Sequence, residues 1–158
     1  MCYHSAEMVT ELPGMSFKAI GLVRNDVKQA PGSGYAWEDV TSEIALDDRL
    51  IKALDNLDEF SHIIVIYWLH RSTGRPPAKI HPRGNKELPR VGLFASRSPN
   101  RPNPVGQKMV TLLQRRGNIL KVKGLDAIDG TPVIDIKPYI PGYDSVKGAK
   151  VPSWVSKR

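Results

Sequence analysis

Residues 60–69 read FSHIIVIYWL and form the most β-prone stretch of the chain. β-Branched and aromatic side chains dominate it, and nearly every position is apolar, which is typical of a strand buried on both faces. We therefore predict a central strand here, with His62 as a hydrogen-bonded histidine of the core. His70 and Arg71 follow it, where the chain leaves the core.

Shorter strands are predicted on both sides of this one. The alternating stretch VIDIK at 133–137 places Val133, Asp135 and Lys137 on one face. Asp47 is expected to cap a helix over 48–57, where leucine and isoleucine recur at helical spacing. About six or more short strands with one helix predict a small, mainly β fold, either a barrel or a sandwich. The other predicted strands cover 17–24, 43–46, 108–114 and 118–124, the last two joined by a hairpin turn.

The stretch GLFASRSPNRPNP at 92–104, here called the proline loop, interrupts this pattern. A short apolar strand signal at its start runs into Pro99, Pro102 and Pro104. Proline removes backbone donors and restricts φ, so neither a helix nor an interior strand continues through it. The loop therefore holds its arginines and asparagines on a stiff segment, suited either to ligand binding or to an ordinary surface turn.

Basic charge is concentrated around the proline loop. Residues 71–121 hold 12 Lys and Arg and a single acid, Glu87, whereas the rest of the chain has 11 basic and 15 acidic residues. Within this part, residues 72–89 form a long basic loop with four prolines. A concentration of positive charge is typical of proteins that bind a polyanion, most often a nucleic acid, although a solvated basic face is the plainer alternative.

Length and composition favour one domain of 15–144, between a leader at 1–14 and a basic tail at 145–158. The single cysteine, Cys2, excludes an internal disulfide framework and agrees with a cytoplasmic location. The longest apolar run, 63–69, is too short to span a bilayer, and the start of the chain resembles no secretory signal. We expect a cytoplasmic protein without a membrane segment.

Common catalytic motifs are missing from the sequence. It contains no Rossmann or P-loop glycine motif, no HExxH and no GxSxG. Asp126, Asp129 and Asp135 fall within ten residues, but their spacing matches no calcium loop and Asp129-Gly130 is a turn signal, so we predict no metal site. Asp135 and Lys137, taken alone, suggest an ion pair more than a catalytic couple.

Two stretches carry a resemblance to a known family. RSPNRPNPVG at 97–106 and LDAIDGTPVIDIKPYIP at 125–141 resemble the two signatures of the TrmO family, also called TsaA-like or YaeB-like, and 59–71 is similar to its buried strand. This resemblance implies a homodimeric S-adenosylmethionine-dependent methyltransferase, built on a small β-barrel in place of a Rossmann sheet, with its cofactor near the dimer interface. The family's characterised activity methylates the exocyclic nitrogen of threonylcarbamoyladenosine beside the tRNA anticodon.

The resemblance also implies site residues. Arg97 suits the carboxylate of the cofactor's methionine part, and the Asp129 turn suits the polar edge of its nucleoside. Asp135 is a candidate proton acceptor, with the holding of Lys137 as an equal alternative. The cofactor positions that carry over are Pro31, Gly32, Ser33, His70, Arg71, Arg97, Gln107, Asp129, Gly130, Thr131 and Pro132. RNA phosphates are expected to meet Arg101, Lys79, Arg83, Arg90, Lys108, Arg115 and Arg116.

Two further functions stay open at this point. One is a non-catalytic RNA-binding barrel, although such barrels expose stacking aromatics and only 7% of these residues are aromatic. The other is a methyltransferase with a different substrate. Bacterial members of the family have a second, C-terminal domain that is not found here, so the short form resembles archaeal members.

Overall fold

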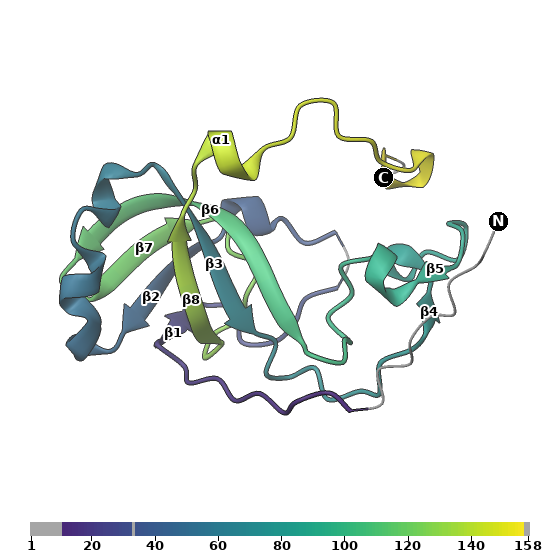
Figure 1. Ribbon diagram of the computed structural model, residues 1–158, viewed down its shortest axis with the longest axis horizontal. Coiled ribbons are helices and arrows are strands. Elements are labelled where there is room, and N and C mark those ends of the chain that lie inside the picture. The colour runs from purple at the N-terminus through teal and green to yellow at the C-terminus, as the bar shows by residue number, and fades with distance from the viewer. Residues whose placement is uncertain (1–10, 33, 157–158) are drawn as a thin grey trace.

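The computed structural model describes residues 11–32 and 34–156 and contains a closed, antiparallel six-stranded barrel, so the prediction of a small β-barrel is confirmed. The strand order around the barrel is β1-β2-β7-β6-β3-β8, with β3 between β6 and β8 (Figure 1). The strands are β1 (Gly21–Arg24), β2 (Thr41–Leu46), β3 (His62–Trp68), β6 (Val105–Arg116), β7 (Ile119–Lys123) and β8 (Pro132–Pro138).

Strand β3 is buried fully on one face only. Ile63, Val65 and Tyr67 point into the barrel and are at most 3% exposed. The residues between them point outward, where Ile64 is 8% exposed but Ile66 and Trp68 are only partly buried, so the prediction of two buried faces holds for only part of this strand. His62 lies on the same outer side, half-buried, with its Nδ1 2.9 Å from Ser61 Oγ; it is hydrogen-bonded as predicted but lies outside the core.

Strand β8 does not alternate as its sequence suggests. Val133 pairs with Tyr67 and Asp135 pairs with Ile66, so Ile134 is an extra residue in a β-bulge. Because the bulge inverts the alternation, Val133 is in the core and Asp135 is not, which corrects the predicted shared face.

The predicted helix over 48–57 is two 3₁₀ segments, η2 (Asp48–Leu54) and η3 (Leu57–Glu59). Asp47 accepts a hydrogen bond from the backbone of Arg49, as expected of the cap. The two segments are separated by Asn56, whose left-handed backbone (φ +65°) interrupts a continuous helix. The Arg115 guanidinium binds the carbonyl oxygens of Ile51 and Leu54 in this arrangement. Among the described residues the only α-helix is the short α1 (Pro141–Asp144).

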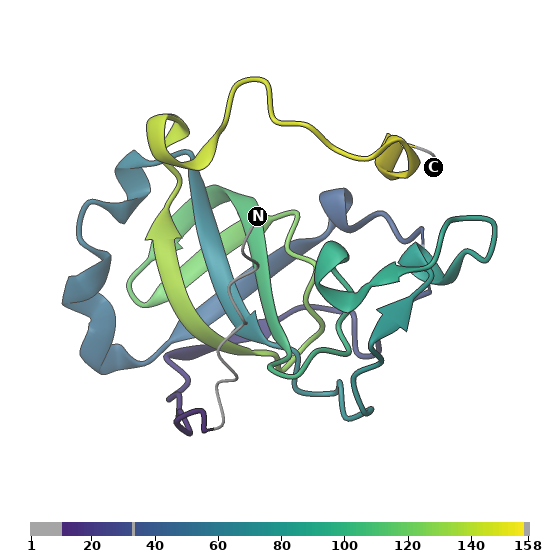
Figure 2. The ribbon, with the colours of Figure 1, turned by 45° about the vertical axis from the view of Figure 1, so that its right-hand side comes forward.

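A second, two-stranded sheet lies beside the barrel (Figures 1 and 2). It pairs β4 (Lys79–Ile80) with β5 (Val91–Gly92), so the basic loop is partly ordered. The strand expected at the start of the proline loop ends at Gly92, and the 3₁₀ turn η5 (Leu93–Ala95) follows. From α1 the chain arches over the molecule to η6 (Ser153–Ser156), near this small sheet. The remaining 3₁₀ turns are η1 (Trp37–Asp39) and η4 (Pro82–Gly84).

Candidate functional site

A small pocket at one end of the barrel gathers several of the predicted cofactor residues. It measures about 180 Å³ and is called here the barrel-end pocket. The neighbours His70 and Arg71 line it together with Thr131, which lies 60 residues after Arg71 in the chain. Its lining residues are Ala30, Leu69, His70, Arg71, Ser72, Pro99, Asn100, Ile128 and Thr131.

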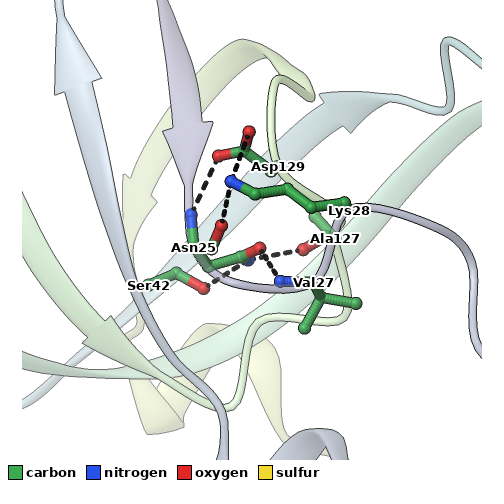
Figure 3. Close-up of polar contacts among 6 residues, drawn as sticks. All are labelled: Asn25, Val27, Lys28, Ser42, Ala127 and Asp129. Carbon is green, nitrogen blue, oxygen red and sulfur yellow. Dashed lines mark hydrogen bonds and ion pairs between the residues drawn. The ribbon is translucent and has the colours of Figure 1, made fainter.

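Asn25 holds the loop after β1 against the turn that precedes β8 (Figure 3). Its side-chain amide donates to Ser42 Oγ and to the carbonyl oxygen of Ala127, both at 2.9 Å, and its Oδ1 accepts from the backbone of Val27. Its backbone N–H donates to the Asp129 carboxylate at 3.1 Å. This single residue therefore joins the two loops that flank the pocket through its side chain and its backbone, and the sequence alone offered no signal for it.

Asp129 occupies the turn that the sequence predicts. Its carboxylate lies 2.9 Å from Lys28 Nζ, and this contact, together with the Asn25 N–H, lowers the pKa of Asp129 below its usual value. Gly130 follows with a φ of +75°, a left-handed conformation that glycine adopts without strain. The turn is therefore held by an ion pair and by its own backbone.

The proline loop is attached to the segment after β3. The Ser72 hydroxyl lies 2.9 Å from the Pro99 carbonyl oxygen and 2.7 Å from Asn100 Oδ1. The backbone of Leu69 donates to the Pro104 carbonyl oxygen at 2.7 Å. These bonds place Pro99 and Asn100 at the wall of the barrel-end pocket.

A larger hollow of about 820 Å³ lies on the other side of this wall, and we call it the proline-loop groove. Arg97 lines this groove and not the barrel-end pocket, whereas Pro99 and Asn100 line both. The groove is bounded by residues 94–100 of the proline loop, by Pro77, Ile80 and 81–84 around the small sheet, and by Trp154 and Val155.

Tyr67 and Asp126 form a partly buried polar contact that sequence reasoning missed. The Tyr67 hydroxyl donates to Asp126 Oδ1 at 2.5 Å, and Lys108 Nζ lies 3.9 Å from the same carboxylate. Burial, followed by the charge and hydrogen bond of Asp126, raises the pKa of Tyr67 well above its usual value, while the charge of Arg97 opposes the shift. The phenol therefore stays a donor across the physiological range.

Other predicted site residues lie elsewhere. Gln107 and Asp135 flank Ile66 on the outer face of the barrel, one on β6 and one on β8. Asp135 Oδ2 lies 2.6 Å from Lys137 Nζ, so the ion pair is present. Neither residue lines the pocket or the groove. Pro31 and Gly32 follow Ala30 at the pocket, Pro132 pairs with β1, and Ser33 lies outside the described residues.

The predicted RNA-binding residues divide into two regions. Lys79, Arg83, Arg90 and Arg101 belong to the small sheet and the proline loop, at the groove end of the molecule, and Lys108 is the residue paired with Asp126. Arg115 and Arg116 lie at the far end of β6 (Figure 1). Arg115 is engaged by Leu54, Ile51, Asp55 and Gly117, so a structural role competes with its predicted contact to RNA.

Each clustered aspartate has its own partner in the structure: Tyr67 for Asp126, Lys28 for Asp129 and Lys137 for Asp135. Within 11–32 and 34–156, no three His, Cys, Asp or Glu side chains come together as a metal site would require. None of the helices in that same part of the chain is long and apolar enough to cross a membrane.

Comparison with known proteins places this architecture in a family. The family model described as the tRNA-methyltransferase O N-terminal domain matches residues 23–145. The chain belongs to the TrmO family. This finding confirms the resemblance carried by the proline loop and by 125–141.

Named relatives and solved structures agree with this family membership. A probable S-adenosyl-L-methionine-binding protein of Methanothermobacter thermautotrophicus is 45% identical over 132 residues, covering 82% of this chain and 93% of its own length. The tRNA (adenine(37)-N6)-methyltransferase of Escherichia coli is 34% identical over 154 residues. The crystal structure of TrmO from Pseudomonas aeruginosa superposes with a TM-score of 0.71 at 30% identity over 89% of this chain.

Several of these relatives are longer than the part that matches. The chain covers 63% of the Escherichia coli enzyme and 62% of the Pseudomonas aeruginosa structure. It covers 37% of a probable S-adenosyl-L-methionine-binding protein of Archaeoglobus fulgidus that is 41% identical to it over 87% of this chain.

Proposed function

We propose that this chain is an S-adenosylmethionine-dependent methyltransferase of tRNA, acting on the exocyclic nitrogen of a modified adenosine, threonylcarbamoyladenosine, next to the anticodon. The observation that carries the proposal is the barrel-end pocket, where His70, Arg71 and Thr131 meet beside the Asp129 turn. Relatives named as tRNA methyltransferases and S-adenosyl-L-methionine-binding proteins support it, and so does the basic segment of the chain.

The lining of the pocket fits this cofactor. Leu69 and Ile128 offer apolar surface to a purine ring, and His70 and Arg71 offer donors to a ribose or a carboxylate. When bound, S-adenosylmethionine supplies the methyl group. The chain's own residues bind and orient: Asn25 holds the turn, and Ser72 holds the proline loop against the pocket. Arg97 reaches a carboxylate only if the cofactor extends past Asn100 into the groove.

The size of the pocket supports a homodimer. Ligand pockets usually measure about 300–1,000 Å³, and the barrel-end pocket is smaller at about 180 Å³. A second copy that packs against the outer face of β6, β3 and β8 would add walls near Gln107. That face carries Ile66, Trp68 and Met109, the last of which is 48% exposed.

We assign Asp135 to the second of its two expected roles, the holding of Lys137. Its carboxylate is 2.6 Å from Lys137 Nζ and also accepts from the backbone of Ile136 at 2.9 Å. Because it lines neither the pocket nor the groove, a role as proton acceptor requires a partner subunit. The variant Asp135→Asn is therefore expected to keep most of the methylation rate of a bulk tRNA substrate.

The first test is calorimetric titration of S-adenosylmethionine into the purified protein. Binding in the micromolar range that Arg71→Ala weakens at least tenfold, while Arg116→Ala does not, would support the pocket. The second test measures transfer of labelled methyl groups to tRNA. An absence of binding heat, with and without tRNA, would overturn the proposal and favour a non-catalytic RNA-binding barrel. Binding without tRNA methylation would favour a different substrate.

A further inference from the structure

The proline-loop groove has a lining suited to a nucleotide. Arg97, His81 and Arg83 contribute basic groups, and no acidic residue is present among the described residues that line it. Phe94 and Trp154 add aromatic rings. Its volume of about 820 Å³ lies within the range of small-molecule sites.

Phe94 is the unusual residue of this groove. Its side chain is 77% exposed, although large aromatic residues are normally buried. The Arg101 guanidinium lies 5.5 Å from the centre of the Phe94 ring and also donates to the Ser96 carbonyl oxygen, so the ring is held in place from one side. An exposed ring that is fixed in this way costs little entropy when a second planar group stacks on it.

We propose that the proline-loop groove holds the acceptor nucleoside of the RNA substrate, stacked on Phe94, while the barrel-end pocket holds the methyl donor. This inference rests on the proposed function and adds the place of the substrate base. RNA-modifying enzymes must take their target base out of the stack and commonly read it between aromatic side chains. The basic residues around the groove then meet the flanking phosphates.

The position of the groove relative to the pocket supports this assignment. Pro99 and Asn100 line both cavities, so the cavities adjoin at these two residues. In-line transfer requires the methyl group of the donor and the acceptor nitrogen to meet about 3–3.5 Å apart, at the edge where the two cavities adjoin. Ser72 holds both from the pocket side. The proline loop thus joins the two binding functions in one stiff segment.

The segment near the C-terminus contributes the outer wall of the groove. Trp154 and Val155 line it from η6, and Arg83 Nη2 donates to the Val155 carbonyl oxygen at 3.3 Å. Figures 1 and 2 show how this segment arches from α1 to the small sheet. A base in the groove would therefore lie between Phe94 and the segment that carries Trp154.

The test compares wild type, Phe94→Ala and Phe94→Tyr. Loss of one base–aromatic stack is expected to lower kcat/KM for tRNA about five- to 150-fold in Phe94→Ala. Affinity for S-adenosylmethionine should stay within twofold, and Phe94→Tyr, which keeps the ring, should retain activity. Tyr143→Ala is the matched control, because Tyr143 is 86% exposed and lies on α1 outside the groove.

Several results would overturn the inference. One is an unchanged kcat/KM for tRNA in Phe94→Ala, and another is a loss of kcat/KM that Tyr143→Ala reproduces. A third is a fall in the affinity of Phe94→Ala for S-adenosylmethionine, which would assign the groove to the cofactor. Anisotropy of fluorescent tRNA, which needs no turnover, provides a second measurement: Phe94→Ala should weaken binding, and no binding by wild type would also overturn the inference. Failure of the proposed function is distinguishable, because wild type would then either not bind S-adenosylmethionine or bind it without methylating tRNA.

Discussion

Gly106 lies opposite Tyr67 in the ladder between β6 and β3, and a Cβ atom on Gly106 would come within 2.3 Å of the Tyr67 ring. The ring therefore occupies the space that any other residue at 106 would need. This close approach lets the Tyr67 hydroxyl reach Asp126 from inside the barrel. Glycine at this place serves packing, and the family signature at 97–106 ends on it.

Replacement of this glycine should be costly. In Gly106→Ala the added methyl group must displace the Tyr67 ring and weaken its bond to Asp126, so we expect a loss of about 1–3 kcal/mol in the free energy of unfolding. Urea denaturation provides the measurement. Gly92→Ala is the control, since nothing lies within 4 Å of its Cβ position. Equal effects of the two variants would contradict the packing argument.

Tyr67 should also shape stability at alkaline pH. Its pKa is raised in the folded protein, mainly by burial and then by Asp126, whereas an unfolded tyrosine titrates near pH 10. The phenol therefore contributes stability that is complete below about pH 10 and is lost progressively as the pH rises further. The free energy of unfolding, measured between about pH 8 and pH 11, should fall less steeply with pH in Tyr67→Phe than in wild type. Parallel curves would refute this role.

Asn25 should matter for both stability and cofactor binding. Asn25→Ala removes two donated bonds and leaves the hydroxyl of Ser42, which is 1% exposed, without this partner. We expect a loss of about 1–3 kcal/mol and a weaker affinity for S-adenosylmethionine, because Ala127, which precedes the Asp129 turn, loses its bond to the Asn25 side chain, while the backbone N–H of residue 25 still binds Asp129. The neighbouring Asp26→Ala, at an exposed position, should change stability by less than about 0.5 kcal/mol. Calorimetry and urea denaturation measure the two effects.

Arg115 and Arg116 are adjacent but should behave differently. Arg115 is 19% exposed and binds backbone carbonyls of η2, so Arg115→Ala is expected to cost about 1–3 kcal/mol in unfolding free energy. Arg116 is exposed, and Arg116→Ala should leave stability nearly unchanged. A reduced salt dependence of tRNA binding in Arg115→Ala, with normal stability, would instead restore its predicted contact to RNA.

The strands and turns of this protein could be predicted from local patterns. β-Branched and aromatic residues at 60–69 indicated β3, and Asp129-Gly130 indicated the turn before β8. The long signatures at 97–106 and 125–141 indicated the family, and they contain four of the nine residues that line the barrel-end pocket. These signals are readable because strand period, turn chemistry and motif composition depend on neighbours in the chain.

Tertiary contacts determined the remainder. The bulge at Ile134 removed Asp135 from the face of Val133, and Arg115, 64 residues from Ile51 in the chain, binds the carbonyl oxygens of the 3₁₀ segment that replaces the predicted helix. Asn25 and Ala127, 102 residues apart in the chain, meet at the pocket, and Tyr67 reaches Asp126 across 59 residues. No local pattern encodes such contacts, because closure of the barrel brings distant segments together and sets which side chains share a cavity. Arg97 lies in the groove and His70 in the pocket for this reason.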